Sequence, residues 1–236
     1  MTTSQPESGQ VFKSLLFTVI IPSLILAKLS TEERLGPTTA FFVALSFPLL
    51  FGLKDIISKR KANFFAIFGL LNVGITGGFG LLQMDGIWFA VKEAAFPLIL
   101  GLGVIISQWT KSPLVHTLIL NESIFDLPKI RGRLEQHNRV LEFKQLTARV
   151  TWLFASSFFL SAVLNFGLAR YVLRSPTGTP EFNAELGQMT ALSLPVISLP
   201  VIIFTLGVFW HLFSQLSKLT MLPKEELLIN KTQNVG

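Results

Sequence analysis

Residues 187–215, GQMTALSLPVISLPVIIFTLGVFWHLFSQ, contain no Asp, Glu, Lys or Arg. About 20 consecutive apolar residues in a helix are enough to cross the bilayer core of about 30 Å. The stretch lacks the alternation of a barrel strand and is too long and too apolar for a soluble helix. It therefore predicts a membrane-spanning helix.

Similar apolar runs occur along the rest of the chain. Charged residues make up only 14% of the sequence, whereas a soluble domain carries about 25%, and the mean hydropathy is +0.56. We therefore expect an all-α, polytopic membrane helix bundle that forms a single transmembrane domain over residues 1–236. The predicted spans are 11–29, 36–53, 63–84, 86–109, 150–172 and 187–215.

The distribution of Lys and Arg predicts the orientation, because cytoplasmic loops retain a positive excess. With these six spans, fifteen of the 20 basic residues fall on the side of the two termini, four fall on the opposite side, and Lys92 lies within a span. Both termini are therefore expected in the cytoplasm. Because the basic residues lie between apolar runs, the net charge of +6 favours membrane lipids over nucleic acid as a partner.

The fourth loop, residues 110–149, contains an amphipathic stretch on the predicted cytoplasmic side. Within residues 128–148, Ile130, Leu134, His137 and Leu141 recur at helical spacing, which predicts a helix. The candidate docking residues for lipid or a partner are Lys129, Arg131, Arg133 and Arg139. A helix on the cytoplasmic interface and a solvated linker helix both fit this pattern.

Prolines recur inside the predicted spans. Each removes an amide from the helix and crowds the carbonyl four residues earlier, so each predicts a kink. The predicted kinks are at Pro22, Pro48, Pro97, Pro195 and Pro200. Transporters form binding sites at broken helices, although ordinary helix bundles contain such prolines too.

The third span is rich in glycine, and Gly74 and Gly78 are spaced four residues apart. Small residues at this spacing let two helix backbones approach, either within one chain or between two copies. We expect helix packing at Gly74, Gly77 and Gly78. A homo-oligomer is compatible with the same pattern.

The pair Lys92 and Glu93 is the strongest polar feature inside the spans. Ionisable residues at depth are costly and usually face protein or water. Lys92 lies about 9 Å from the start of its span, near enough for its long side chain to snorkel outward. Two interpretations remain open. The pair is either a functional polar site that holds a water or cation near Glu93 or a structural ion pair. Asn72 and Asn165 are expected to make interhelical hydrogen bonds.

The sequence contains no pattern of catalytic or metal-binding residues. It has no cysteine, and His116, His137 and His211 lie in separate segments without a carboxylate at ligand spacing. It also lacks a Ser-His-Asp arrangement and a phosphate-binding glycine loop. We therefore expect a protein that is not an enzyme and that uses no cofactor or metal ion.

Two groups of residues carry a family resemblance over about residues 75–170. The first group comprises Gly77, Gly78, Leu81, Leu82, Asp85, Lys92, Ser107, Gln108, Pro113 and Leu114. The second comprises Arg149, Trp152, Phe158, Phe159, Asn165 and Ala169. In order and spacing they resemble the intracellular septation protein A family of bacterial inner-membrane proteins.

The chain departs from that family in two places. Residues 118–148 form a long basic stretch where the family has a short loop, and Glu185 to Thr190 lacks the family's Trp-Asn-Phe-Lys type of motif. The chain therefore resembles a distant relative of the septation protein A family or a member of a sister family.

The resemblance implies a multi-pass inner-membrane protein with a non-enzymatic, structural or interaction role in cell-envelope maintenance or septation. Its partners would be cell-envelope or division proteins. The alternative function is a small transporter or channel for an ion, lipid or metabolite, which would use the polar site near Glu93 and the proline-broken helices.

Overall fold

The computed structural model describes residues 12, 15–59, 64–110, 120 and 124–229. Within these ranges the chain is helical and contains no strand, and one isolated antiparallel bridge joins Phe125 and Leu228. The prediction of an all-α chain is confirmed for this part of the sequence.

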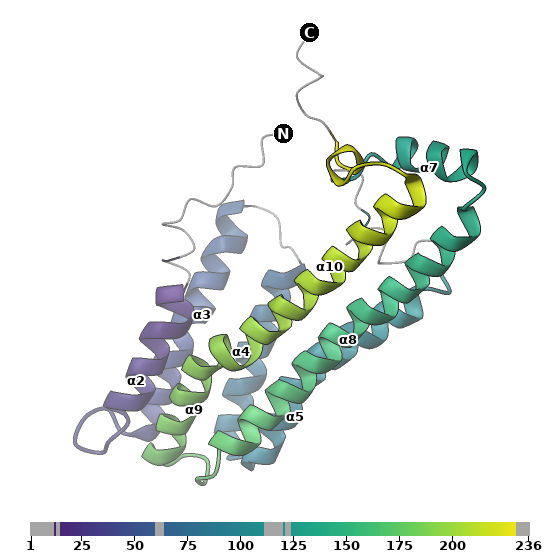
Figure 1. Ribbon diagram of the computed structural model, residues 1–236. Coiled ribbons are helices and arrows are strands. Elements are labelled where there is room, and N and C mark those ends of the chain that lie inside the picture. Colours follow the sequence, from purple (N-terminus) through teal and green to yellow (C-terminus); the bar gives the residue numbers. More distant parts are fainter. Residues whose placement is uncertain (1–11, 13–14, 60–63, 111–119, 121–123, 230–236) are drawn as a thin grey trace. The chain divides into compact units, whose positions relative to one another are not determined.

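The α-helices carry the labels of Figure 1. The π-helical and 3-10 turns are called η. In chain order they are η1 (Leu16–Ile20), α2 (Ile21–Leu29), α3 (Pro37–Lys59), α4 (Phe64–Leu81), α5 (Gly86–Ser107), α7 (Leu127–Gln136), α8 (Val140–Val172), α9 (Pro180–Ser193), η2 (Leu194–Ser198), α10 (Leu199–Thr220) and η3 (Lys224–Leu227).

Several helical stretches are long and apolar enough to cross a bilayer. Among the described residues, four meet both conditions: Pro37–Lys54, Gly86–Ser107, Val140–Val172 and Pro180–Thr220. The first and third predicted spans only overlap the shorter apolar helical stretches Leu16–Leu29 and Leu71–Leu81, which fall below the length of a span. Residues 11, 13–14 and 63 of those two spans lie outside the described residues. Long apolar helices of this kind suggest a multi-pass membrane protein.

The fifth predicted span is shorter than the helix that contains it. α8 begins at Val140, whereas the predicted span begins at residue 150. Phe143 and Leu146 keep helical spacing through the charged segment. Charge therefore indicates where the apolar segment ends, and the helix itself continues beyond that point.

Two of the prolines with predicted kinks are associated with π-helical turns. Pro22 lies in the first turn of α2, directly after η1, where the Ile21 N–H donates to the carbonyl of Leu16 five residues earlier. Pro195 lies within η2. The wider hydrogen-bond pattern of a π turn offers another donor to carbonyls near a proline. The other three lie inside α3, inside α5 and in the first turn of α10: Pro48, Pro97 and Pro200.

Contacts between Cα atoms divide the chain into two compact units, and each is described separately. Unit 1 comprises Met1–Ala94 and Leu164–Ile197, and unit 2 comprises Ala95–Val163 and Ser198–Gly236. A single transmembrane domain stays a prediction.

Unit 1 is built on α2, α3 and α9, which lie side by side (Figure 1). Small residues let these helices approach closely, and Ala40 of α3 is fully buried. A Cβ atom added to Gly187 of α9 would lie 2.8 Å from the Ser23 carbonyl oxygen of α2. The rings of Phe89 and Phe182 meet edge to face beside them, with centroids 5.1 Å apart.

The core of unit 2 joins α7 to α10 and η3. Ile130 and Leu134 of α7 are buried together with Leu212 and Leu216 of α10 and Leu227 of η3. The apolar side of α7 therefore faces protein, and it is not available to lipid.

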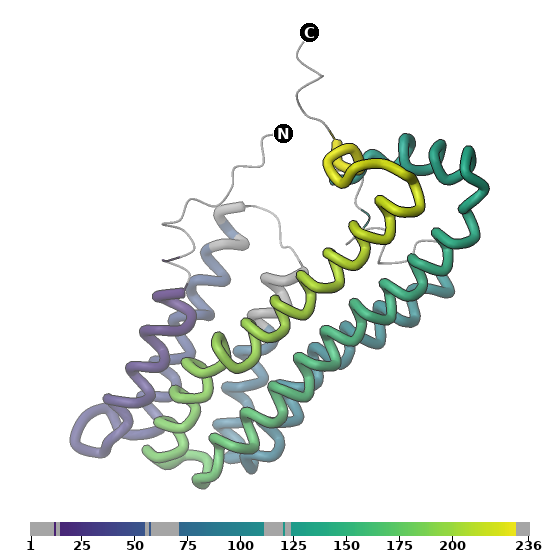
Figure 2. The backbone as a smooth tube through the Cα atoms, viewed as in Figure 1, coloured from purple at the N-terminus to yellow at the C-terminus, as the bar shows by residue number. Residues whose placement is uncertain are grey.

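The amphipathic helix predicted over residues 128–148 is two helices, which corrects that prediction. α7 ends at Gln136 and α8 begins at Val140, and Figure 2 shows the chain turning between them. Asn138 has a φ of 53°, a left-handed conformation that asparagine tolerates better than most residues. Leu141 is consequently 68% exposed and does not continue the buried side of α7.

Many large apolar side chains on the long helices are exposed, among them Ile99, Val163, Ile203 and Leu206. Extended exposed apolar surface is unfavourable in water, whereas hydrocarbon provides a suitable solvent for it. The exposed apolar surface therefore supports the same interpretation as the length and composition of these helices, namely that they lie in a membrane.

Candidate functional site

Lys92 lies in the second turn of α5, and its side chain is only 6% exposed. Its Nζ donates to Asn72 Oδ1 at 3.0 Å and to Thr76 Oγ1 at 2.6 Å, both on α4. Glu93 Oε1 lies 2.7 Å from the same nitrogen. We call these four residues of unit 1 the Lys92 cluster.

The α4 side of the Lys92 cluster depends on helical spacing. Asn72 and Thr76 are one turn apart, so their side chains share one side of the helix. The Thr76 hydroxyl donates to the backbone carbonyl of Asn72 at 2.8 Å, and its oxygen accepts from Lys92. The Thr76 hydroxyl therefore acts as a donor within α4 and as an acceptor for the Lys92 amine.

The Lys92 amine is fully satisfied. An ammonium group carries three donors and no acceptor. The amine has three acceptors within reach, Asn72 Oδ1, Thr76 Oγ1 and Glu93 Oε1, and the carboxylate also balances its charge. A buried charge is tolerated when it is paired and hydrogen-bonded. The cluster can therefore fasten α4 to α5 without a bound ligand.

Lys92 does not use the possibility, left open by its position near the start of the span, of snorkelling outward. Its side chain turns onto α4 and does not extend outward, because three acceptors lie within its reach. Glu93 remains 24% exposed, so the two members of the pair are buried to different degrees. Of the predicted polar residues, the structure brings Lys92, Glu93 and Asn72 together. Asn165, partly buried on α8, is not among the three partners of the amine.

Sequence reasoning missed two polar residues of unit 1. Thr76 had one usable signal, its position one turn after Asn72. Asn183 of α9 is 1% exposed and donates to the Pro37 carbonyl at 2.6 Å and to Ser30 Oγ at 3.1 Å. No local pattern relates Asn183 to these partners, because they are distant in sequence.

The predicted packing glycines have different surroundings. A Cβ atom at Gly77 would lie 3.5 Å from the Leu45 side chain, in ordinary contact. At Gly74 and Gly78 an added Cβ would meet none of the described residues within 4 Å. Packing within the chain is therefore found at Gly77, and packing between copies at Gly74 and Gly78 stays a prediction. Closer approaches are found at Gly80, Gly101 and Gly187.

Three of the predicted docking residues interact with the C-terminal part of unit 2. Lys129 Nζ lies 2.7 Å from Glu226 Oε2, and Arg139 donates to the Lys218 carbonyl at 3.0 Å. The hydrogen bond and charge of Lys129, together with the charge of Arg133, hold the pKa of the Glu226 carboxyl below its ordinary value. Arg131 makes no ion pair with another described residue.

The part of the chain that the structure describes contains no group of three or more His, Asp or Glu side chains able to hold a metal ion. His137 and His211 each have a buried Nε2 without a hydrogen-bond partner, and His116 lies outside the described residues.

No family model, curated protein or solved structure matches this chain.

Proposed function

We propose that the chain is a multi-pass protein of the bacterial inner membrane that crosses the bilayer six times, with both termini in the cytoplasm. Each predicted span overlaps a helix or a run of consecutive helices in the described residues. The partition of basic residues supports the orientation.

Exposed aromatic residues support the proposed position in the bilayer. Trp88 lies near the start of α5 and Trp109 lies just beyond its end, and both are exposed. A helix of this length rises about 33 Å, close to the thickness of the hydrocarbon core of about 30 Å. Exposed Trp152 and Tyr171 are similarly separated along α8. Trp and Tyr favour the membrane–water interface, so each pair fits the two edges of one span.

The proposed role is structural or interactive and not catalytic. The observation that carries this proposal is the closed Lys92 cluster, in which every donor of the intramembrane amine has an acceptor from the protein. Such a cluster joins helices and leaves no donor of the amine for a substrate. A part in cell-envelope maintenance or septation rests on the sequence resemblance alone.

The competing proposal is a small transporter or channel that uses Glu93. The partial exposure of Glu93 and the π-helical turns at Pro22 and Pro195 favour it. The two proposals differ in whether ions cross the membrane through the protein.

Flux through sealed vesicles that contain the purified full-length protein tests this difference. Trapped dyes would report proton, sodium and potassium flux for the natural chain, for Glu93→Gln and for the loop control Glu33→Gln. We expect all three to match protein-free vesicles. A flux that is lost in Glu93→Gln and kept in Glu33→Gln would contradict the structural role.

Crosslinking in native membranes, followed by mass spectrometry, tests the proposed partners. We expect links to cell-envelope or division proteins, or to a second copy of the chain. If the chain is linked to no protein under conditions that crosslink other membrane proteins to their partners, the interaction role is wrong.

A further inference from the structure

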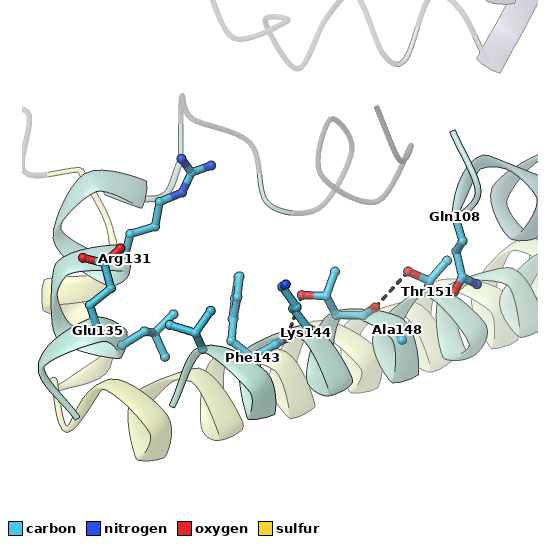
Figure 3. A pocket seen from close by; sticks show the side chains of 10 residues that line it. Gln108, Arg131, Glu135, Phe143, Lys144, Ala148 and Thr151 are labelled. Carbon is cyan, nitrogen blue, oxygen red and sulfur yellow. Dashed lines mark hydrogen bonds between the residues drawn. The ribbon is translucent and has the colours of Figure 1, made fainter. Parts of the chain in front are cut away.

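A groove of about 400 Å³ lies within unit 2, between α7, the first turns of α8 and the end of α5 (Figure 3). α7 contributes Arg131 and Glu135, and α8 contributes Phe143, Lys144 and Ala148. Gln108, just after α5, lines the other end. Most of the lining surface is apolar.

The charges of the groove suit an anion. In the view of Figure 3, the ring of Phe143 lies between Arg131 of α7 and Lys144 of α8. Neither cation makes an ion pair with another described residue, in contrast to Lys129, which pairs with Glu226. Glu135 is the one acidic side chain among the described lining residues. Arg and Lys are the side chains that bind phosphate groups best.

The groove also lies at the right depth for a lipid. α8 has 33 residues and is about 50 Å long, so it is longer than the bilayer core. Exposed Trp109 and Trp152 directly follow the lining residues Gln108 and Thr151 and are expected at the interface. Lys144 lies about 12 Å further along α8, on the proposed cytoplasmic side.

We propose that this groove binds one anionic phospholipid of the adjoining leaflet. Its phosphate lies between Arg131 and Lys144, and its ester groups lie toward Gln108. The glycerol and the first methylenes cover Phe143 and Ala148. This site goes beyond the structural role proposed above and does not depend on the Lys92 cluster.

Binding of short-chain lipids to the detergent-solubilised full-length protein tests the proposal. The probes are dioctanoyl phosphatidylglycerol, dioctanoyl phosphatidylcholine and glycerol 3-phosphate, with affinity measured by calorimetry. We expect phosphatidylglycerol to bind and the other two to bind at least about tenfold more weakly, with the preference falling as salt screens the charges. Equal binding of phosphatidylcholine would show a neutral amphiphile site, and equal binding of glycerol 3-phosphate a soluble phosphate site. Either result would overturn the proposal, as would the absence of binding.

Two matched double variants locate the site. Arg131→Gln with Lys144→Gln removes both groove cations and is expected to weaken phosphatidylglycerol binding about 30-fold. Arg133→Gln with Arg149→Gln makes the same charge change on the same two helices outside the groove, and we expect less than about a threefold effect. Equal weakening in the two double variants would mean that only net charge matters and would overturn the proposal.

A third variant fills the groove without changing charge. Ala148 is exposed on α8, so Ala148→Trp leaves the packed cores of unit 2 intact. We expect it to weaken phosphatidylglycerol binding at least about tenfold through loss of the apolar contact area. Unchanged affinity would place the lipid elsewhere.

Discussion

At the scale of single residues, the Lys92 cluster shows what sequence can indicate about a buried charge. The sequence identified Lys92, Glu93 and Asn72, because ionisable and amide side chains are rare inside apolar helices. It did not identify the direction of the lysine side chain. That direction depends on Thr76 of α4, which approaches only when α4 and α5 are packed.

Replacing Lys92 should destabilise unit 1. Lys92→Met leaves the Glu93 carboxylate without its cation and Asn72 without its donor. Breaking a buried ion pair typically costs about 3–5 kcal/mol, and partial exposure of Glu93 lowers our expectation to about 2–3 kcal/mol. The measurement is unfolding of the detergent-solubilised protein.

Lys28→Met is the matched control, since Lys28 is exposed near the end of α2. We expect its effect to remain within about 0.5 kcal/mol. If the two lysine variants have equal stability, the Lys92 cluster does not fasten α4 to α5.

Two glycines in helices should respond in opposite directions to alanine. In Gly187→Ala the new methyl group meets the Ser23 backbone at 2.8 Å, and overpacking of this kind costs about 1–3 kcal/mol. In Gly78→Ala the methyl group meets none of the described residues within 4 Å, so the better helix propensity of alanine should stabilise the helix by up to about 1 kcal/mol. Thermal unfolding of both variants measures the difference. A similar shift in both would contradict the close approach of α2 and α9.

At the scale of elements, the sequence predicted the type of structure better than its boundaries. Apolar runs of sufficient length predicted the spanning helices, which the structure confirms as helices. The break between α7 and α8 was missed because residues 128–148 keep a helical pattern through His137. The turn at Asn138 is closed by local backbone hydrogen bonds, among them the Arg139 N–H to the Leu134 carbonyl at 2.8 Å, a helix C-cap for which glycine is the usual signal and asparagine a weaker one.

The packing of α7 should depend on Ile130 and not on Leu141. Ile130 is fully buried against α10, so Ile130→Ala should cost about 2–5 kcal/mol and accelerate hydrogen exchange of the α7 amides. Leu141→Ala removes a side chain that is 68% exposed and should change exchange in α7 little. Equal acceleration in the two variants would mean that one continuous helix surface packs against α10.

At the scale of the whole molecule, composition predicted more than any motif. The scarcity of charge and the segregation of basic residues predict a membrane protein and an orientation. Function was harder to predict, because a structural polar cluster and a transport site contain the same types of polar residue, which are rare inside apolar helices. The difference lies in which donors and acceptors meet, and that depends on the packing of helices that are separate in sequence.

The proposed position of the Lys92 cluster within the membrane and that of the groove on the cytoplasmic side both rest on the proposed arrangement of six crossings with the two termini inside. Single-cysteine labelling tests this arrangement most directly, because the natural chain has no cysteine. The variants Glu33→Cys, Gln136→Cys and Glu225→Cys place one thiol in the first loop, on α7 and in η3. With a membrane-impermeant maleimide, we predict labelling of Glu33→Cys in intact cells and of the other two only after permeabilisation. Labelling of Gln136→Cys or Glu225→Cys in intact cells would contradict the account.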